Sequence, residues 1–366
     1  MVRRHAAPDD DLPLVSVVTP SLNQGAFVED AIESVWGQDY RPLEHVVVDG
    51  GSTDATRDIL HAHDHLVWRS EPDHGQSDAL NRGFRLARGE ILGWLNADDA
   101  YLPGAVRAAV DHFRWSPEVD AVYGDCHVVD ERRRLLHVIR PGPLALRRLL
   151  TFDQSLPQPT MFFRRRVLDR VGGVDRALDL AMDVDFAFRL ARKARCAYVP
   201  GIRAMYRLHP ATKSSVHGSR VLPEILLILI RTFTDRSLTP ALASRRREAV
   251  AAAYISDGIR AFHAGDRVRA RQQLMAGLSR YPQPFRMRTV KALLLLGDCV
   301  LGTRVTPCLR ALVHQWSRRA PLAGPGVRPP ASGPGPAAGA TRPDPAGTRG
   351  GTSPGSPRGR SCRSRS

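Results

Sequence analysis

Short apolar runs alternate with apolar residues at helical spacing between residues 14 and 123. Runs rich in Val, Ile and Leu predict strands, whereas apolar residues that recur every three or four positions predict helices. Strands are expected at 14–19, 44–48, 65–68, 90–95 and 119–123, and helices at 27–36, 54–62, 79–86 and 103–113. Strands that alternate with helices over short connections favour an α/β fold, with a mostly parallel sheet wrapped by helices.

The pattern becomes less regular between 125 and 215, and it becomes helical after 218. Strands are expected near 128 and at 135–139, 197–199 and 204–206, and helices at 183–193, 222–230, 245–263 and 267–278. We therefore divide the chain into a polar N-terminal segment (1–12), an α/β domain (13–218), a helical extension (219–320) and a tail (321–366). The tail holds ten Pro and ten Gly without apolar periodicity, which predicts disorder.

Two apolar features concern packing. The stripe at 222–230 is either the packing face of the helical extension, which we favour, or an interfacial membrane helix. Trp36 and Trp94 are both expected in the core of the α/β domain.

The formal charge of +16 does not by itself indicate nucleic-acid binding. Seven Arg and one Asp in the tail account for +6 of it, and the chain holds only three Lys. No basic stripe interleaved with aromatic residues accompanies the remaining charge, so nucleic acid is not an expected partner. The excess can still favour nucleotide phosphates or anionic lipid head groups.

The cysteines and the apolar runs bear on the cellular compartment. Five scattered Cys without C-x-x-C spacing indicate reduced thiols and neither a disulfide framework nor a zinc site. The first eleven residues lack the apolar core of a signal peptide, and no apolar run reaches about 18 residues. We expect a cytoplasmic protein and leave open a peripheral position at the inner face of the cell membrane.

Three loops directly follow predicted strands and carry the candidate chemistry. They span 19–23, 48–54 and 96–99. Ligands of open parallel sheets bind outside the carboxyl ends of the strands, so the three loops are expected at one edge. Asp98 and Asp99 are either hard ligands for Mg²⁺ or Mn²⁺ or the cap of the next helix. No G-x-G-x-x-G follows the first strand and no P-loop motif occurs, which disfavours dinucleotide and P-loop folds.

Five blocks of the chain together resemble family 2 glycosyltransferases, which have the GT-A fold. The blocks are SVVTPSLN at 16–23, VDGGSTD at 48–54, DALNRG at 78–83, GEILGWLNADD at 89–99 and MDVDFAFRL at 182–190. Each block is loose alone, but their order and spacing make the set specific. The resemblance covers roughly residues 14–215.

The resemblance implies roles for individual residues. Pro20, Asn23 and Asp49 would line the nucleotide pocket, with Gly51 allowing close approach of the donor, and Asp78 and Asn81 would lie near its ribose and diphosphate. Asp98, with Asp99 beside it, matches the metal-binding D-x-D element, and Asp183 matches the catalytic base. Asn96 stands where many relatives have the first acid of that element, so the strength of metal binding is an open question.

Further residues outside these five blocks are expected to contact the donor, the metal or the acceptor. Arg207 and Lys213 are expected to contact the donor diphosphate. His209 is either an additional metal ligand or a structural histidine. Gln158 and Thr160, in a loop bounded by prolines, are expected to face the acceptor.

These residues predict an inverting glycosyltransferase that depends on Mn²⁺ or Mg²⁺. It would move a sugar from a nucleotide-diphosphate sugar to a hydroxyl acceptor, such as a lipid-linked or cell-surface glycan precursor. One carboxylate would take the proton of the acceptor hydroxyl, while a divalent ion would offset the charge on the departing diphosphate. The alternative is a non-catalytic nucleotide-sugar-binding or membrane-scaffold protein with a degenerate site, for which Asn96 is the main argument.

Overall fold

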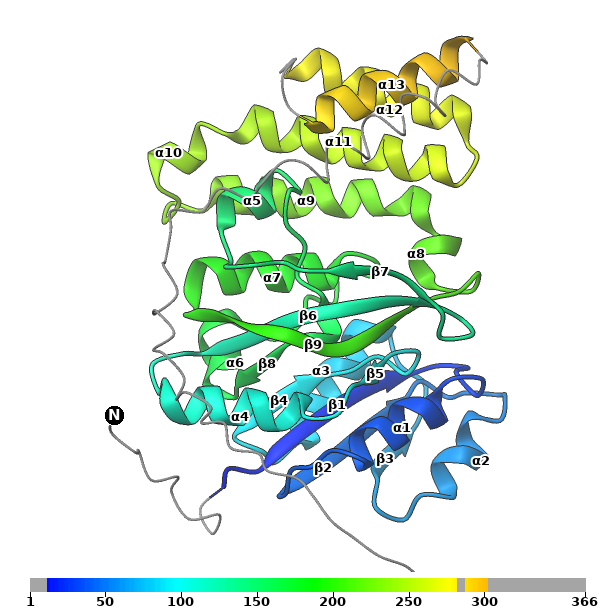
Figure 1. The fold of residues 1–366 in the computed structure, drawn as a ribbon, viewed down its shortest axis with the longest axis vertical. Coiled ribbons are helices and arrows are strands. Elements are labelled where there is room, and N and C mark those ends of the chain that lie inside the picture. Colours follow the sequence, from blue (N-terminus) through cyan, green and yellow to red (C-terminus); the bar gives the residue numbers. More distant parts are fainter. Residues whose placement is uncertain (1–11, 282–286, 302–366) are drawn as a thin grey trace, which may run out of the picture. The chain divides into compact units, whose positions relative to one another are not determined.

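The structure is a computed structural model that describes residues 12–281 and 287–301 (Figure 1). The predicted tail and parts of the predicted N-terminal segment and helical extension therefore lie outside the described residues. The strands are β1 (Val15–Ser21), β2 (Leu43–Asp49), β3 (Val67–Ser70), β4 (Ile91–Trp94), β5 (Ala100–Tyr101), β6 (Ala121–Asp130), β7 (Leu135–Ile139), β8 (Phe162–Arg164) and β9 (Cys196–Leu208).

The helices lie between and after these strands. In the sheet-forming part they are α1 (Val28–Trp36), α2 (Thr56–His61), α3 (Gln76–Leu86), α4 (Ala105–Trp115), α5 (Leu146–Leu150), α6 (Arg166–Val171), α7 (Met182–Lys193) and α8 (Lys213–Val216). Those that follow are α9 (Val221–Thr234), α10 (Pro240–Ala243), α11 (Arg246–His263), α12 (Arg267–Arg280) and α13 (Met287–Leu301).

All the strands belong to one sheet, in the order β3-β2-β1-β4-β8-β6-β9-β5, with β7 paired to β6. The first four strands are parallel, as predicted. The second half is mixed, because β8 runs antiparallel to both β4 and β6 whereas β6 and β9 are parallel. The α/β architecture is confirmed, and the parallel arrangement holds mainly for the half formed by β1 to β4.

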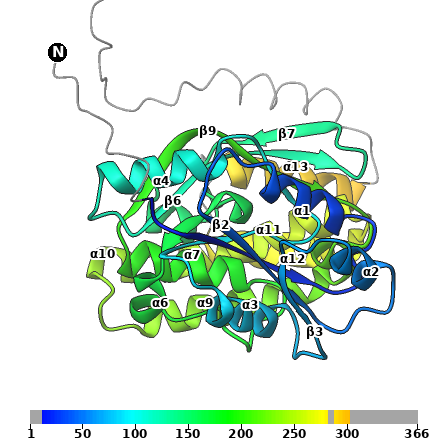
Figure 2. The same ribbon diagram turned by 90° about the horizontal axis from the view of Figure 1, so that it is seen from below.

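Alternation along β1 divides the core between the two faces of the sheet. Val17 packs with residues of α1 and α4, and Val18 packs with residues of α3 and α7. Successive side chains of a strand point to opposite faces, so a strand covered on both sides is apolar at nearly every position. Figure 2 shows α1 and α4 on one side of the sheet and α3, α6 and α9 on the other.

A close contact between α3 and β1 explains the glycine of the DALNRG block. A Cβ atom on Gly83 would lie 2.3 Å from Cγ1 of Val18. Only glycine permits this approach, which sets α3 directly on the central strand. The start of α3 is thereby held close to the carboxyl ends of β1 and β4.

The helical extension shares the core of the sheet through α9. Val221, Leu222, Ile225, Ile228 and Leu229 are buried in the same cluster as Val18 and Phe186. The packing interpretation of the stripe at 222–230 is therefore confirmed. Helices α11 to α13 form a further cluster of their own around Ile255, Phe262 and Leu274.

Two predictions about local structure were wrong, and one helix was missed. The strands expected at 197–199 and 204–206 are one strand, β9, which continues through Gly201 at a φ of 119°. Trp36 is 56% exposed and is not a core residue; its ring lies 4.2 Å from that of His65, and the Arg41 guanidinium covers it. Helix α13 was not predicted, because its apolar run lacks a recognisable start signal.

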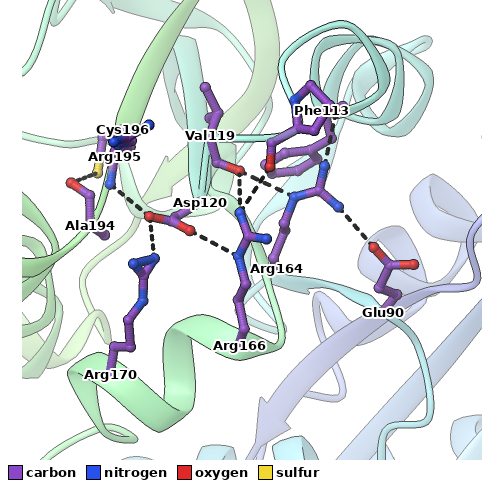
Figure 3. A network of polar contacts seen from close by, with 11 residues as sticks. Glu90, Phe113, Val119, Asp120, Arg164, Arg166, Arg170, Ala194, Arg195 and Cys196 are labelled. Atoms are coloured by element: carbon purple, nitrogen blue, oxygen red, sulfur yellow. Dashed lines mark hydrogen bonds and ion pairs between the residues drawn. The ribbon is translucent and has the colours of Figure 1, made fainter.

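A buried carboxylate joins the amino ends of β6 and β9 to α6 (Figure 3). Asp120 is 1% exposed; it forms ion pairs with Arg166 at 3.0 Å and Arg170 at 2.5 Å, and it accepts the Arg195 amide at 2.9 Å. Burial acts to raise the pKa of Asp120, but the bonds from Arg170, the Arg195 amide and Arg166 hold it below its ordinary value of 3.8. The carboxylate is therefore charged in the folded protein near neutral pH.

We expect Asp120→Asn to lower the free energy of unfolding by about 1–3 kcal/mol near pH 7, because it removes the charge of a buried acceptor that binds three donors. The folded pKa lies below the unfolded value, so this stabilisation is complete above pH 3.8 and is lost as the pH falls through the folded pKa. Denaturant unfolding at pH 7 and in acid should show the two proteins converging at low pH. Asp169→Asn, at an exposed position of α6, is the control and should change little. Equal losses in both variants, or a gap that persists in acid, would contradict this account.

Candidate active site

A cavity of about 690 Å³ opens at the carboxyl ends of β1 and β4. Of the predicted site residues, those that line it are Pro20, Asp98, Gln158, Asp183 and Lys213. They come from the end of β1, the loop after β4, the 155–159 segment, the start of α7 and α8. The cavity also contains residues that the sequence did not single out, namely Asp73, Gln76, Asp179 and Tyr206 among others.

Asp98 lines the cavity and is in contact with His209, which lies outside the lining. The Nε2 atom of His209 lies 3.2 Å from Oδ2 of Asp98. The imidazole ring packs on Phe27, with the two ring centroids 4.5 Å apart, and it is largely buried. This packing holds the ring so that Nε2 faces the carboxylate.

Asp99 points away from the cavity. Its Oδ1 atom accepts the backbone amide of Arg207 at 2.9 Å, and its Oδ2 atom is buried without a hydrogen-bond partner. Burial, and next the charge of Asp98, raise the pKa of Asp99 well above its ordinary value. Asp99 thus ties the loop after β4 to the end of β9.

Arg207 is also turned into the protein. Its guanidinium pairs with Asp30 at 2.7 Å, donates to the carbonyl of Asp98 at 2.9 Å and lies over the ring of Phe27. The structure therefore places Arg207 behind Asp98 and outside the cavity lining. Its contact with the Asp98 carbonyl fixes the backbone that carries the candidate metal ligand.

Asn96, in the loop after β4, forms hydrogen bonds with three side chains. Its Oδ1 accepts Nε1 of Trp94 and Nε2 of Gln76, both at 2.9 Å, and its Nδ2 donates to Oε1 of Gln158 at 3.0 Å. Gln158 in turn donates to the Trp94 carbonyl at 2.5 Å. The indole Nε1 of Trp94 can only donate a hydrogen bond, so the atom of the Asn96 amide that faces Trp94 must be the oxygen. An amide suits this position because both an acceptor and a donor are used.

Asp183 lies in the first turn of α7 and lines the cavity. Its Oδ1 accepts the amide of Val184 at 2.9 Å. Burial raises the pKa of Asp183 above its ordinary value of 3.8, and the charge of Glu224 acts in the same direction. A carboxylate whose pKa is raised by its surroundings is a stronger proton acceptor, which suits a general base.

The loop after β2 is built around Asp49. This fully buried carboxylate accepts the amides of Gly51 and Ser52 at 3.2 and 2.8 Å, and the hydroxyls of Ser52 and Ser70. Gly51 has a φ of 85°. Asn23 has a φ of 52° and accepts the amide of Thr53 at 2.9 Å, which links this loop to the end of β1. Asn23, Asp49 and Gly51 therefore shape the edge, and none of them lines the cavity.

Asp78, Asn81 and Thr160 do not line the cavity either, and each is bonded to other protein groups. Asp78 pairs with Arg82 at 2.9 Å and Arg176 at 3.3 Å. Asn81 exchanges two hydrogen bonds with the backbone of Val174, at 2.7 and 2.9 Å. Thr160 donates to the carbonyl of Pro157 at 2.8 Å. The first two connect α3 to the segment that precedes α7.

The donor set at the cavity is small for a metal ion. Among residues 12–281 and 287–301, no group of three or more His, Cys, Asp or Glu side chains is arranged to hold one. Asp98 and His209 offer one carboxylate and one imidazole side by side. Mg²⁺ in phosphate-binding sites commonly takes one or two protein carboxylates and completes its shell with water and substrate phosphates. The two residues fit an ion that is shared with a bound diphosphate.

Comparisons with known proteins identify the family to which the chain is similar. The family model described as glycosyl transferase family 2 matches residues 16–172. An uncharacterized glycosyltransferase of Mycobacterium tuberculosis is 34% identical over 183 residues, which cover 49% of this chain and 69% of the relative. A PGL/p-HBAD biosynthesis glycosyltransferase of Mycobacterium bovis is 33% identical over 183 residues, with 48% and 69% covered.

Solved structures share the fold at low sequence identity. Residues 1–349 of Staphylococcus aureus TarS in complex with UDP-GlcNAc superpose with a TM-score of 0.56 at 17% identity, covering 83% of this chain and 87% of that one. A mannosyltransferase of Pyrobaculum calidifontis in complex with GDP-Man and Mn²⁺ gives a TM-score of 0.51 at 20% identity, with 86% and 85% covered. From the sequence relatives and the shared architecture, we conclude that the chain is a glycosyltransferase of family 2 with a GT-A fold.

Proposed function

We propose that the protein transfers a sugar from a nucleotide-diphosphate sugar to a hydroxyl acceptor, with inversion and with the help of a divalent ion. The observation that carries the proposal is that Asp183 lines the same cavity as Asp98, which is in contact with His209. They come from different parts of the fold, the start of α7 and the loops after β4 and β9. An acceptor-side base and a donor-side clamp can thus act on one sugar bound between them.

Asp183 is the proposed general base. Its carboxylate takes the proton of the acceptor hydroxyl while the hydroxyl oxygen bonds to the anomeric carbon and the bond to the diphosphate breaks. A single displacement of this kind inverts the anomeric configuration. Burial raises the pKa of Asp183, which makes its carboxylate a stronger proton acceptor.

Asp98 and His209 are the proposed protein ligands of Mn²⁺ or Mg²⁺. When bound, such an ion offsets the negative charge on the departing nucleoside diphosphate. Asp99 and Arg207 hold the backbone of these ligands, as their contacts indicate. The GDP-Man and Mn²⁺ complex of the structurally similar mannosyltransferase supports a divalent ion.

Donor binding is assigned first to residues that line the cavity. Pro20 and Lys213 lie there, and the Lys213 ammonium can reach an anionic diphosphate if it leaves Asp179, to which it is bonded at 2.6 Å. Asn23, Asp49 and Gly51 would act by shaping the loops that receive the nucleotide, and Asp78 and Asn81 by fixing α3. The UDP-GlcNAc complex of TarS supports a nucleotide-sugar donor.

The acceptor is proposed to be a hydroxyl of a cell-surface glycan or glycolipid precursor. A part of the cavity wall is apolar, with Leu22, Ile139, Leu156 and Met182 among its residues, and Gln158 adds a polar group. The name of the Mycobacterium bovis relative supports a glycolipid acceptor. Within the described part of the chain, no helix has the length and apolar character needed to cross a bilayer.

Asp183→Asn should reduce turnover by roughly a hundredfold or more, because it removes the proton acceptor. Binding of UDP or GDP with Mn²⁺, measured by calorimetry, should stay close to the wild-type value. The matched control is Asp185→Asn on the same helix, since Asp185 is occupied by Arg189 at 2.7 Å. Wild-type turnover in Asp183→Asn would overturn the assignment of the base.

Activity should disappear in EDTA and return on addition of Mn²⁺ or Mg²⁺. His209→Ala should raise the concentration of metal needed for half-maximal activity by roughly tenfold or more. His63→Ala is the control, because His63 pairs with Glu29 and not with Asp98. Activity that is indifferent to chelation would reject the metal, and an unchanged metal requirement in His209→Ala would reject this ligand.

A further inference from the structure

Glu224, in the first turn of α9, reaches three consecutive backbone amides that lead into α7. Its Oε1 accepts the amide of Asp179 at 3.1 Å, and its Oε2 accepts the amides of Leu180 and Ala181 at 2.9 and 2.8 Å. Asp179 and Leu180 themselves line the cavity. A carboxylate from the helical extension thus holds the wall of the candidate active site.

These bonds fix the residues that lead into α7, up to its N-cap residue. Ala181 is the N-cap residue of α7 and cannot supply a side-chain hydrogen bond. The first amides of a helix have no partner within the helix, and the helix dipole favours negative charge there. Glu224, from a different helix, places a negative charge at this end of α7 and binds the amide of Ala181, which lies two residues before Asp183.

The segment before α7 is anchored on both sides. Toward α3, the Ser77 hydroxyl donates to the carbonyl of Leu178 at 2.8 Å, and Asn81 holds Val174. Toward α9, Arg231 pairs with Asp175. Of these contacts with α9, the bonds from Glu224 reach the residues nearest to Asp183 in the sequence. Glu224 therefore fixes the backbone immediately before α7.

We propose that Glu224 is a positioning residue for Asp183, so that the helical extension forms part of the catalytic apparatus. This inference rests on the proposed role of Asp183 as the general base. Glu224 does not touch the reacting atoms. It fixes where α7 begins and therefore where the Asp183 carboxylate stands in the cavity.

The charge of Glu224 supplies a second effect that a purely structural contact would not have. It acts with burial to raise the pKa of Asp183, whereas the Val184 amide lowers it. The other charged side chains that line this cavity are Asp73, Asp98, Asp179 and Lys213. Because the base must be ionised, the rate falls as the pH drops through the pKa of Asp183. Neutralising Glu224 should lower that pKa and move the acidic limb of the pH profile to lower pH.

The test compares Glu224→Gln with Asp257→Asn. Glu224→Gln keeps the shape of the side chain but loses the charge and one of the two acceptor oxygens. We expect kcat to fall roughly tenfold, with the KM for the donor within about twofold of wild type, because the base is displaced and the donor clamp is not. The acidic limb should move to lower pH, and hydrogen exchange of the amides of Asp179, Leu180 and Ala181 should become faster.

Asp257→Asn is the matched control in the same extension. Asp257 is buried and pairs with Arg269 at 2.8 Å, far from the segment before α7 in the sequence. This variant should be less stable to heat but keep the wild-type pH profile and the wild-type exchange of the three amides. If Glu224→Gln shows wild-type kcat, pH profile and amide exchange, the inference is wrong even where Asp183→Asn is inactive. If Asp183→Asn is active, the proposed function has failed instead.

Discussion

The carboxyl end of β1 is the constraint on which the rest of the site depends. This strand is buried along its whole length and pairs in parallel with β2 and β4. The loops after β1, β2 and β4 must therefore leave the sheet at one edge, where Pro20, the Asp49 loop and Asp98 lie. The two core clusters on opposite faces of the sheet hold this edge rigidly, so the polar side chains there are positioned by packed strands.

The polar groups at this edge divide into those that face the cavity and those that hold them. Asp98 and Asp183 face the cavity. Asp49 and Asp99 look similar in the sequence, yet Asp49 accepts amides and hydroxyls of the loops around it, and one oxygen of Asp99 accepts the backbone amide of Arg207. The same division explains Asn96, whose amide is used as both acceptor and donor. Asn96 is an integrated part of the loop, which argues against a site that has simply degenerated.

Local pattern was sufficient to predict β1 to β4 and α1 to α4, since strands buried on both faces such as β1, β2 and β4 leave a clear apolar signal, but it missed the short elements β5, β8, α5 and α6. The loops at the carboxyl edge followed from the order of these elements. Local pattern could not predict contacts between distant segments. Glu224 and Asp179 are 45 positions apart, and nothing in the sequence near either residue indicates that they meet. Trp36 shows a second limit, since apolar spacing on a helix does not reveal that a histidine and an arginine will cover an exposed ring. The predicted roles of Asp78 and Asn81 near the donor remain predictions, although both side chains are engaged with protein partners.

The central claim is that Asp183 and the Asp98–His209 pair act on one sugar from two sides of a single cavity. A crystal structure of the protein with Mn²⁺ and UDP or GDP, with the metal located by anomalous scattering, tests this claim most directly. The account predicts a Mn²⁺ peak within coordination distance of Asp98 and His209, a diphosphate bound to it, and the Asp183 carboxylate open to the same space. A metal or diphosphate bound outside this cavity, or an Asp183 carboxylate sealed off from it, would contradict the account.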